Sequence, residues 1–154
     1  MSNPSAGYLP AGLPIPVAEP DGLSAPYWQG LRQGKLLVQR CSHCNTWQFG
    51  PEWLCHRCQA FDPAWTEVEP RSRIFSWERV WHPSHAALKG HGPYIAVLVE
   101  LPHAGGIRMV GNLLGDPAQK VMIGADVDGV FEHHLDSNPP YSLLQWRQQQ
   151  VSST

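Results

Sequence analysis

Four cysteines constrain this chain more than any other feature of its sequence. They are the only cysteines among its 154 residues, and all of them lie between positions 41 and 58. They form two C-x-x-C motifs, Cys41 with Cys44 and Cys55 with Cys58, separated by ten residues. Because each motif turns its two thiols towards one point, the pair predicts four thiolates around one tetrahedral ion. We expect a structural zinc ion, since a closed four-thiolate site leaves no open position for water or substrate.

Three other interpretations of the cysteines remain open. They could form disulfides, they could hold a rubredoxin-type iron, or His43 or His56 could replace one thiolate. Zinc is favoured over iron because Asn45 and Gln59 follow the two motifs, where rubredoxin-type turns usually have glycine. Zinc binding contributes about 10–16 kcal/mol in small peptides, which is enough to fold a ribbon that has almost no apolar core.

The composition predicts a folded protein without a nucleic-acid or membrane role. Charged residues make up 16% of the chain, and 11 Lys and Arg stand against 13 Asp and Glu. A chain with so few cations lacks the basic surface that phosphate contacts need. The sequence has no apolar run of about 18 residues and no signal-peptide pattern. We therefore expect a cytoplasmic protein, where clustered cysteines bind metal more often than they form disulfides.

The N-terminal third predicts an arm, a short helix and one strand before the cysteines. Residues 1–22 contain five prolines and should form an extended arm ordered in part by contacts. A helix should begin at Ser24 as its N-cap and end at Gly34. Its apolar face should hold Tyr27, Trp28 and Leu31.

After the cysteines the chain is strand-like. We expect five strands, at residues 73–81, 94–101, 107–114, 127–133 and 143–147. In the first of them, Phe75, Trp77, Arg79 and Trp81 should share one face. Five short strands in about 80 residues fit a small closed barrel of the OB type. The predicted fold is therefore mainly β, with an N-terminal helix and a rubredoxin-like zinc ribbon (23–66) between the arm (1–22) and a five-stranded OB-fold barrel (67–154).

The ribbon region is also unusually rich in aromatic residues. Trp47, Phe49, Trp53, Phe61 and Trp65 are too many for the interior of so small a unit. An exposed aromatic cluster of this kind is typical of a protein interface.

An ordered set of motifs resembles one known family. The helix region reads Pro26-Tyr27-Trp28-x-Gly30-Leu31-x-x-Gly34-Lys35-Leu36, and both C-x-x-C motifs follow it. The barrel region adds Ile74-Phe75-Ser76-Trp77, then PYIAVLVEL at 93–101, GIRMVGNL at 106–113, and Val121-x-Ile123-Gly124-x-x-Val127. In this order they resemble the zinc-ribbon/OB-fold acyl-CoA-associated family, long known as domain of unknown function thirty-five. The resemblance covers residues 23–147.

The resemblance implies a non-catalytic, accessory subunit of a thiolase-type hetero-oligomer. A thiolase-like partner would supply the reactive cysteine and histidines. This chain would help to bind the coenzyme A thioester, the shared substrate, and would hold the complex together. The reactions implied are thiolysis, Claisen-type acyl transfer or retro-aldol cleavage of a carbon–carbon bond.

Basic residues and histidines of the barrel are the candidate coenzyme A contacts. We expect these contacts at Arg73, His82, His85, Lys89 and Arg108, although a solvated rim would have the same residues. The sequence contains no nucleophile elbow, no zinc-protease motif and no phosphate-binding loop. Two other functions stay open: a free-standing OB-fold module for single-stranded nucleic acid, and a rubredoxin-like electron carrier.

Overall fold

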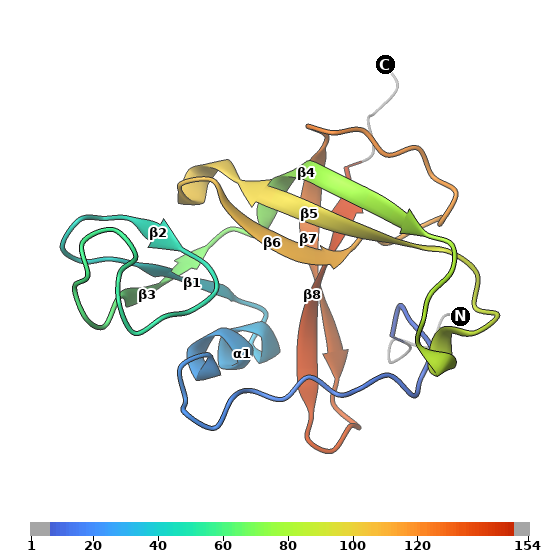
Figure 1. The fold of residues 1–154 in the computed structure, drawn as a ribbon, viewed down its shortest axis with the longest axis horizontal. Coiled ribbons are helices and arrows are strands. Elements are labelled where there is room, and N and C mark those ends of the chain that lie inside the picture. The colour runs from blue at the N-terminus through green and yellow to red at the C-terminus, as the bar shows by residue number, and fades with distance from the viewer. Residues whose placement is uncertain (1–6, 150–154) are drawn as a thin grey trace.

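The computed structural model describes residues 7–149, which form one helix-bearing zinc ribbon joined to a β-barrel (Figure 1). The helix is α1 (Ala25–Arg32), and short 3-10 turns are η1 (Ala86–Leu88) and η2 (Pro102–Ala104). The strands are β1 (Leu36–Arg40), β2 (Trp47–Gln48), β3 (Ala64–Val68), β4 (Arg71–Val80), β5 (Tyr94–Leu101), β6 (Ile107–Asn112), β7 (Asp126–His134) and β8 (Tyr141–Gln148). The expected order of arm, helix, ribbon and barrel is thus present.

The ribbon is a three-stranded antiparallel sheet in the order β2–β1–β3. Helix α1 packs against β1 and also reaches β8, so it lies between the ribbon and the barrel (Figure 1). Leu31 of the helix and Leu36 and Val38 of β1 are fully buried in one shared core. The helix therefore depends on both sheets, as expected for a helix of only eight residues.

The helix begins and ends at the predicted residues, but the side chain of Ser24 does not cap it. Gly34 follows the last turn with φ 70°, a conformation that glycine adopts without strain. Ser24 occupies the N-cap position, yet its side chain makes no capping hydrogen bond. Its backbone is helical (φ −92°, ψ −1°), whereas a capping hydroxyl needs an extended backbone to reach back to the first turn. The prediction of a Ser24 cap was wrong.

No described helix is long and apolar enough to cross a membrane.

The second sheet closes into the predicted OB-fold barrel. Its strand order is β6–β5–β4–β7–β8, with every neighbouring pair antiparallel. A parallel bridge between Leu113 and Trp146 joins its two edges, and the Leu114 amide donates a 2.7 Å hydrogen bond to the Trp146 carbonyl. Trp146 is fully buried at this seam. Five strands with this order and closure are the OB-fold topology.

The face assignment of β4 was wrong in part. The register with β5 skips from Ile74 to Ser76, so Phe75 forms a β-bulge. Beyond the bulge the alternation is inverted: Phe75 is 41% exposed, while Trp77 packs against the core. A bulge adds one unpaired residue and so reverses which side chains face inward. Phe75 and Trp77 therefore do not share a face.

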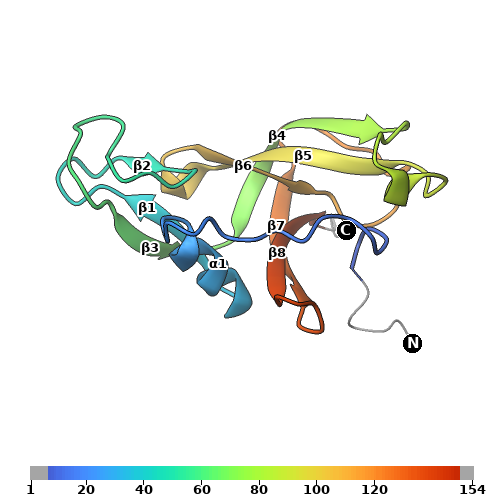
Figure 2. The ribbon, with the colours of Figure 1, turned by 60° about the horizontal axis from the view of Figure 1, so that its bottom comes forward.

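The N-terminal arm lies along the barrel rather than away from it. Its described part, residues 7–22, contains neither helix nor strand. It crosses β7 and β8 and reaches the loop that carries η1 (Figure 1 and Figure 2). Residues 1–6 of the predicted arm, and 150–154 of the predicted barrel segment, lie outside the described residues.

Gly111 makes the barrel seam possible and supplies a stability test. A Cβ at this position would lie 2.8 Å from Cδ1 and 2.9 Å from Nε1 of Trp146. We expect Gly111→Ala to lower the free energy of unfolding by about 1–3 kcal/mol, because the buried indole cannot move without straining the core. Urea unfolding measures this. The control is Val110→Ala, at an adjacent position that is 74% exposed. This control should change the free energy of unfolding by less than about 0.5 kcal/mol. Equal effects of the two variants would contradict the seam assignment.

Candidate metal centre

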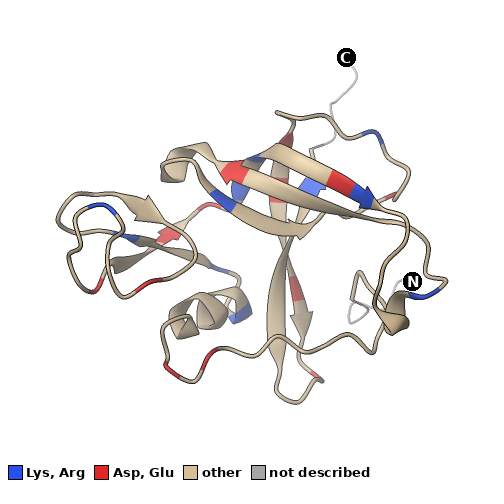
Figure 3. Cartoon of the chain, viewed as in Figure 1, with Lys and Arg blue, Asp and Glu red and all other residues tan. Residues whose placement is uncertain are grey.

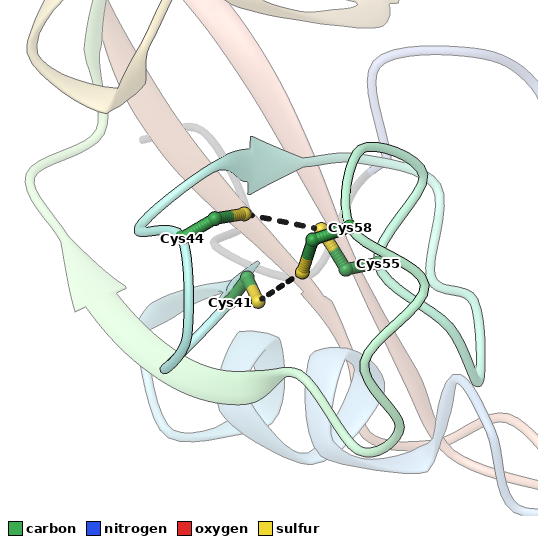
Figure 4. Close-up of side chains that lie close together, drawn as sticks. All are labelled: Cys41, Cys44, Cys55 and Cys58. Atoms are coloured by element: carbon green, nitrogen blue, oxygen red, sulfur yellow. Dashed lines mark hydrogen bonds between the residues drawn. The ribbon is translucent and has the colours of Figure 1, made fainter.

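The four cysteine sulfurs meet at one point between the two loops of the ribbon (Figure 4). All four Sγ atoms lie within 4.8 Å of one another. Cys41 Sγ is 3.5 Å from Cys58 Sγ, and Cys44 Sγ is 3.6 Å from Cys55 Sγ. Four thiolates around zinc, with Zn–S bonds of about 2.3 Å, have S···S separations of about 3.8 Å. The sulfurs are therefore spaced for a tetrahedral ion and are too far apart for disulfides, whose S–S bond is about 2.05 Å.

The two loops have the same backbone geometry, which explains why their sulfurs converge. In the first, the Cys41 amide donates to the Thr46 carbonyl and the Asn45 amide donates to the Cys41 carbonyl, both at 2.9 Å. In the second, Cys55 pairs with Ala60 and Gln59 with Cys55 in the same way, again at 2.9 Å. Each motif is thus a closed turn that presents both of its thiols on one side.

Asn45 and Gln59 occupy the positions where these turns usually have glycine. Their φ angles are 59° and 61°, so both adopt the left-handed conformation despite their side chains. The absence of glycine therefore does not alter the turn, so this feature does not by itself distinguish zinc from iron. The strain is instead borne by two ordinary residues, at a cost of about 1–2 kcal/mol each.

The thiols differ in how readily they lose a proton. A hydrogen bond with the Thr46 hydroxyl, 3.1 Å from Cys44 Sγ, is the main cause that lowers the pKa of Cys44 to about 6. The pKa of Cys58 is raised to about 12: a backbone hydrogen bond with Ala60 lowers it, but the neighbouring sulfurs of Cys41 and Cys44 outweigh that effect. Four thiolates so close together need a cation between them, which is the electrostatic role that Zn²⁺ fills in such sites.

A buried pair of glutamines fixes the second loop, and sequence reasoning missed it. Gln48 Nε2 donates to Gln39 Oε1 at 2.8 Å, and both side chains are at most 5% exposed. Gln39 then holds the backbone of Glu52 through two hydrogen bonds, and Gln48 accepts from the His56 amide at 3.2 Å. These contacts join strands β1 and β2 to the loop that follows β2. No local pattern signals them.

His56 is used in this network rather than at the metal. Its Nδ1 lies 3.2 Å from Gln48 Oε1, and neither His56 nor His43 belongs to the group of converging ligand atoms. Cys41, Cys44, Cys55 and Cys58 are therefore the ligands that fit the ion, and substitution of a histidine for one of them is not supported.

The five candidate coenzyme A contacts fall into two separate groups. Arg73 on β4 and Arg108 on β6 flank Glu100 of β5, with which both are in register. Arg108 Nε pairs with Glu100 at 3.1 Å and its guanidinium stacks 3.5 Å over the Phe75 ring, while Arg73 Nε lies 3.4 Å from Asp126. Both arginines lie near the start of their strands, and β4 begins three residues after the end of β3 of the ribbon.

His82, His85 and Lys89 lie in the loop between β4 and β5, beyond the other end of β4. All three are exposed. His85 caps η1 by accepting the Ala87 amide at its Nδ1, at 3.1 Å. Since β4 continues for seven residues beyond Arg73, to Val80, roughly 23 Å of strand lies between the two groups. The structure does not bring all five residues to one site.

Some of the aromatic side chains that were expected at the surface pack against other parts of the protein. Trp47 packs on the turn after η2, where a Cβ at Gly105 would lie 2.8 Å from its Cδ1, and Phe49 stacks edge-on against Tyr27 at 5.4 Å. Trp53 and Phe61 remain 49% and 74% exposed on the second cysteine loop. A prominent apolar patch thus adjoins the metal site.

The metal can be identified directly. We expect the purified protein to be colourless and to contain one zinc per chain, measured by elemental analysis after dialysis. A red preparation with iron in the same ratio would favour the electron-carrier interpretation instead.

The left-handed residues offer a second test. Gln59→Gly should raise the free energy of unfolding of the zinc-loaded protein by about 1 kcal/mol, because it relieves backbone strain. Asn45→Gly should raise the free energy of unfolding by less, since asparagine tolerates the left-handed conformation better than glutamine. Urea unfolding in the presence of zinc measures both. Gln59→Ala retains the strain and is the control; a gain with alanine equal to that with glycine would show that strain is not the cause.

Two family models match the chain in succession. Residues 28–64 match the ChsH2 rubredoxin-like zinc ribbon domain, and residues 65–132 match the ChsH2 C-terminal OB-fold domain. A curated relative from Thermomonospora curvata, described as a probable enoyl-CoA hydratase alpha subunit, is 33% identical over 121 residues. The match covers 79% of this chain but 36% of that protein, so the chain spans about a third of its relative's length.

Solved structures agree with these matches. A chain of the structure described as Ltp2-ChsH2(DUF35) aldolase is 30% identical, with a TM-score of 0.71 over 87% of this chain and 98% of that chain. A DUF35 protein of unknown function from Sulfolobus solfataricus has a TM-score of 0.59 at 16% identity, over 82% and 85% of the two chains, and shows the same fold. The chain described here belongs to the ChsH2 (DUF35) family of zinc-ribbon and OB-fold proteins.

Proposed function

We propose that this protein is an accessory subunit of an enzyme complex that acts on acyl-CoA thioesters, in which a thiolase-like partner carries out the chemistry. The observation that carries the proposal is the closed four-thiolate site: it uses every cysteine of the chain as a metal ligand and leaves none as a nucleophile. A closed site of this kind stabilises a fold but offers no open coordination position for catalysis.

One pair of side chains that resembles a catalytic arrangement is also poorly placed to act alone. His133 Nδ1 lies 2.7 Å from Ser142 Oγ, which resembles a nucleophile with its base. Ser142, however, is only 1% exposed, so a substrate carbonyl cannot approach its hydroxyl. This arrangement supports a binding or assembly role for the chain.

The relatives support the same class of function. One structural relative belongs to an assembly described as an aldolase of Ltp2 and ChsH2(DUF35). The curated relative is named as the alpha subunit of a probable enoyl-CoA hydratase, and the ribbon and barrel account for only 36% of it. Both descriptions associate this fold with a larger enzyme. The second also favours another candidate for this chain, a complex with a hydratase-type partner.

The exposed aromatics of the second cysteine loop are the partner contact in this proposal. Trp53 and Phe61 project from a loop that the metal and the glutamine pair hold rigid, which lowers the entropic cost of docking. Large aromatic side chains are the residues that most often dominate binding energy at interfaces.

For the coenzyme A phosphates, the loop group suits better than the arginine pair. Arg73 and Arg108 are each already paired with a carboxylate. Within residues 7–149, no carboxylate pairs with Lys89, His82 or His85. We place the phosphate contacts at these three residues, whose donors remain available to an anionic ligand.

The proposal is tested by isolating the protein, tagged, from its native host and identifying the chains that co-elute. A thiolase-like chain should co-elute in a fixed ratio. The complex should cleave or form a carbon–carbon bond next to a thioester, and the isolated chain should not. A hydratase-like chain would select the second candidate, and turnover of acyl-CoA by the isolated chain would contradict both.

The docking surface has its own test. Phe61→Ser should reduce recovery of the partner at least about tenfold, because loss of an interface anchor costs about 2 kcal/mol or more. Val110→Ser, at a barrel position that is equally exposed (74%), is the control and should leave recovery unchanged. Zinc content should be the same in both variants.

A further inference from the structure

A cavity of about 860 Å³ lies between the N-terminal arm and the barrel. The arm forms one wall, with Leu9, Leu13 and Ile15 among its lining residues, and Leu143 of β8 contributes to the other. Figures 1 and 2 show the arm crossing β7 and β8 at this place. The volume lies within the range of about 300–1,000 Å³ that is typical of small-molecule sites.

The arm packs closely against the barrel at specific residues. A Cβ at Gly7 would lie 2.6 Å from His134 Cε1 and 3.0 Å from Glu132 Oε1, so only glycine allows the backbone to come this close. Further along, a Cβ at Gly12 would lie 3.3 Å from the Ala87 side chain. Burial raises the pKa of Tyr8, although a backbone hydrogen bond with Ile95 opposes the shift. The cavity therefore has a wall with a defined position.

One end of the cavity is polar and its groups are held in place. His134 Nε2 donates to Glu132 Oε1 at 2.6 Å, with both side chains less than a fifth exposed. Gln145 Nε2 donates to Glu132 Oε2 at 3.2 Å, and Gln145 Oε1 accepts the Asn112 amide at 2.8 Å. The Tyr141 ring stacks on His134 at 4.4 Å. Such a network fixes the carboxylate at the end of an otherwise mostly apolar space.

The charge of the lining restricts what can bind. Among the described residues that line the cavity, none is Lys or Arg, and Glu132 provides a carboxylate. A phosphate or carboxylate would thus be buried beside a like charge with no strong cation to compensate, which is unfavourable. Each oxygen of Glu132 accepts one hydrogen bond from the protein and has capacity for another. The polar end therefore suits a hydrogen-bond donor.

The position of the cavity agrees with this chemistry. OB folds bind ligands at the loops between their first and second and their fourth and fifth strands. In this chain the arm touches the first of these loops at Ala87, and Ser137 of the second lines the cavity together with the arm. The arm thus covers part of this region and leaves a partly open site of a size that suits a small molecule.

We propose that the cavity beneath the arm binds a neutral molecule with an apolar body and a single hydroxyl or N–H donor, which Glu132 accepts. This site is separate from the phosphate contacts proposed above at His82, His85 and Lys89. It does not depend on a partner enzyme, so it can be tested on the isolated protein whether or not the proposed function is correct.

The test uses N-phenyl-1-naphthylamine, a neutral fluorescent probe with one N–H donor, and its sulfonated analogue 8-anilino-1-naphthalenesulfonate. The neutral probe should bind saturably at one site per zinc-loaded chain, and the anion at least about tenfold more weakly, because it would lie near Glu132. In competition, 1-naphthol should displace the probe about tenfold better than 1-methoxynaphthalene, which has the same rings but no donor. Equal binding of the neutral and anionic probes, or equal displacement by the two naphthyl competitors, would overturn the proposal.

Two arm variants provide a matched control. Leu13→Asp places a charge in the lining and should weaken binding of the neutral probe at least about tenfold. Val17→Asp makes the same change on the same arm, at a position that is 65% exposed and outside the lining, and should leave binding unchanged. Both variants alter the arm and spare the barrel core, so their circular dichroism spectra should be alike. Equal binding by the two variants would assign the probe to another apolar surface and overturn the proposal.

Discussion

The mutual repulsion of four converging thiolates is the constraint on which the rest of this structure depends. The segment between β2 and β3 has no regular strand of its own, apart from one bridge between Leu54 and Phe61. Two things hold it to the sheet: the ion expected at the cysteines, and the Gln39–Gln48 pair. The ribbon sheet in turn buries one face of α1, whose Leu31 joins the barrel core. Metal binding at one end thus supports packing that extends to β8.

The sequence was sufficient for features that depend on local patterns. The cysteine spacing predicted the metal centre, and alternation with glycine turns predicted five strands and the OB topology. Features that depend on distant contacts were missed. The bulge at Phe75 changes the face of every later residue in β4, but a single added residue has no distinct sequence signature. The hydrogen bonds of Gln39 with Glu52 and of Gln145 with Glu132 join residues 13 positions apart, and they depend on how the strands and loops pack rather than on a local sequence pattern.

The separation of the predicted coenzyme A contacts has a geometric cause. Arg73 lies near the start of β4, the longest described strand, and His82 lies just beyond its end. Because the strand is extended, these two residues are far apart in space although they are close in sequence. Charge then distinguishes the two groups further. Each arginine is paired with a carboxylate, while among residues 7–149 no carboxylate pairs with Lys89, His82 or His85. Basic residues are scattered over the chain rather than gathered on one face (Figure 3). This distribution is expected if affinity for a coenzyme A thioester rests on a few contacts rather than on a broad positive surface.

The arm bears most directly on the choice between functions. A module for single-stranded nucleic acid needs an open OB-fold face with bases stacked along it. Here the arm lies against the loop of η1 and against β7, and Gly7 fits on the His134 ring with no room for a side chain. A polymer would have to displace a segment whose contacts are specific, on a surface that carries few cations. A small neutral ligand needs no such displacement, and a protein partner would meet the aromatics of the ribbon at the other end of the molecule. The proposed docking surface and the proposed ligand cavity therefore lie on separate parts of the fold.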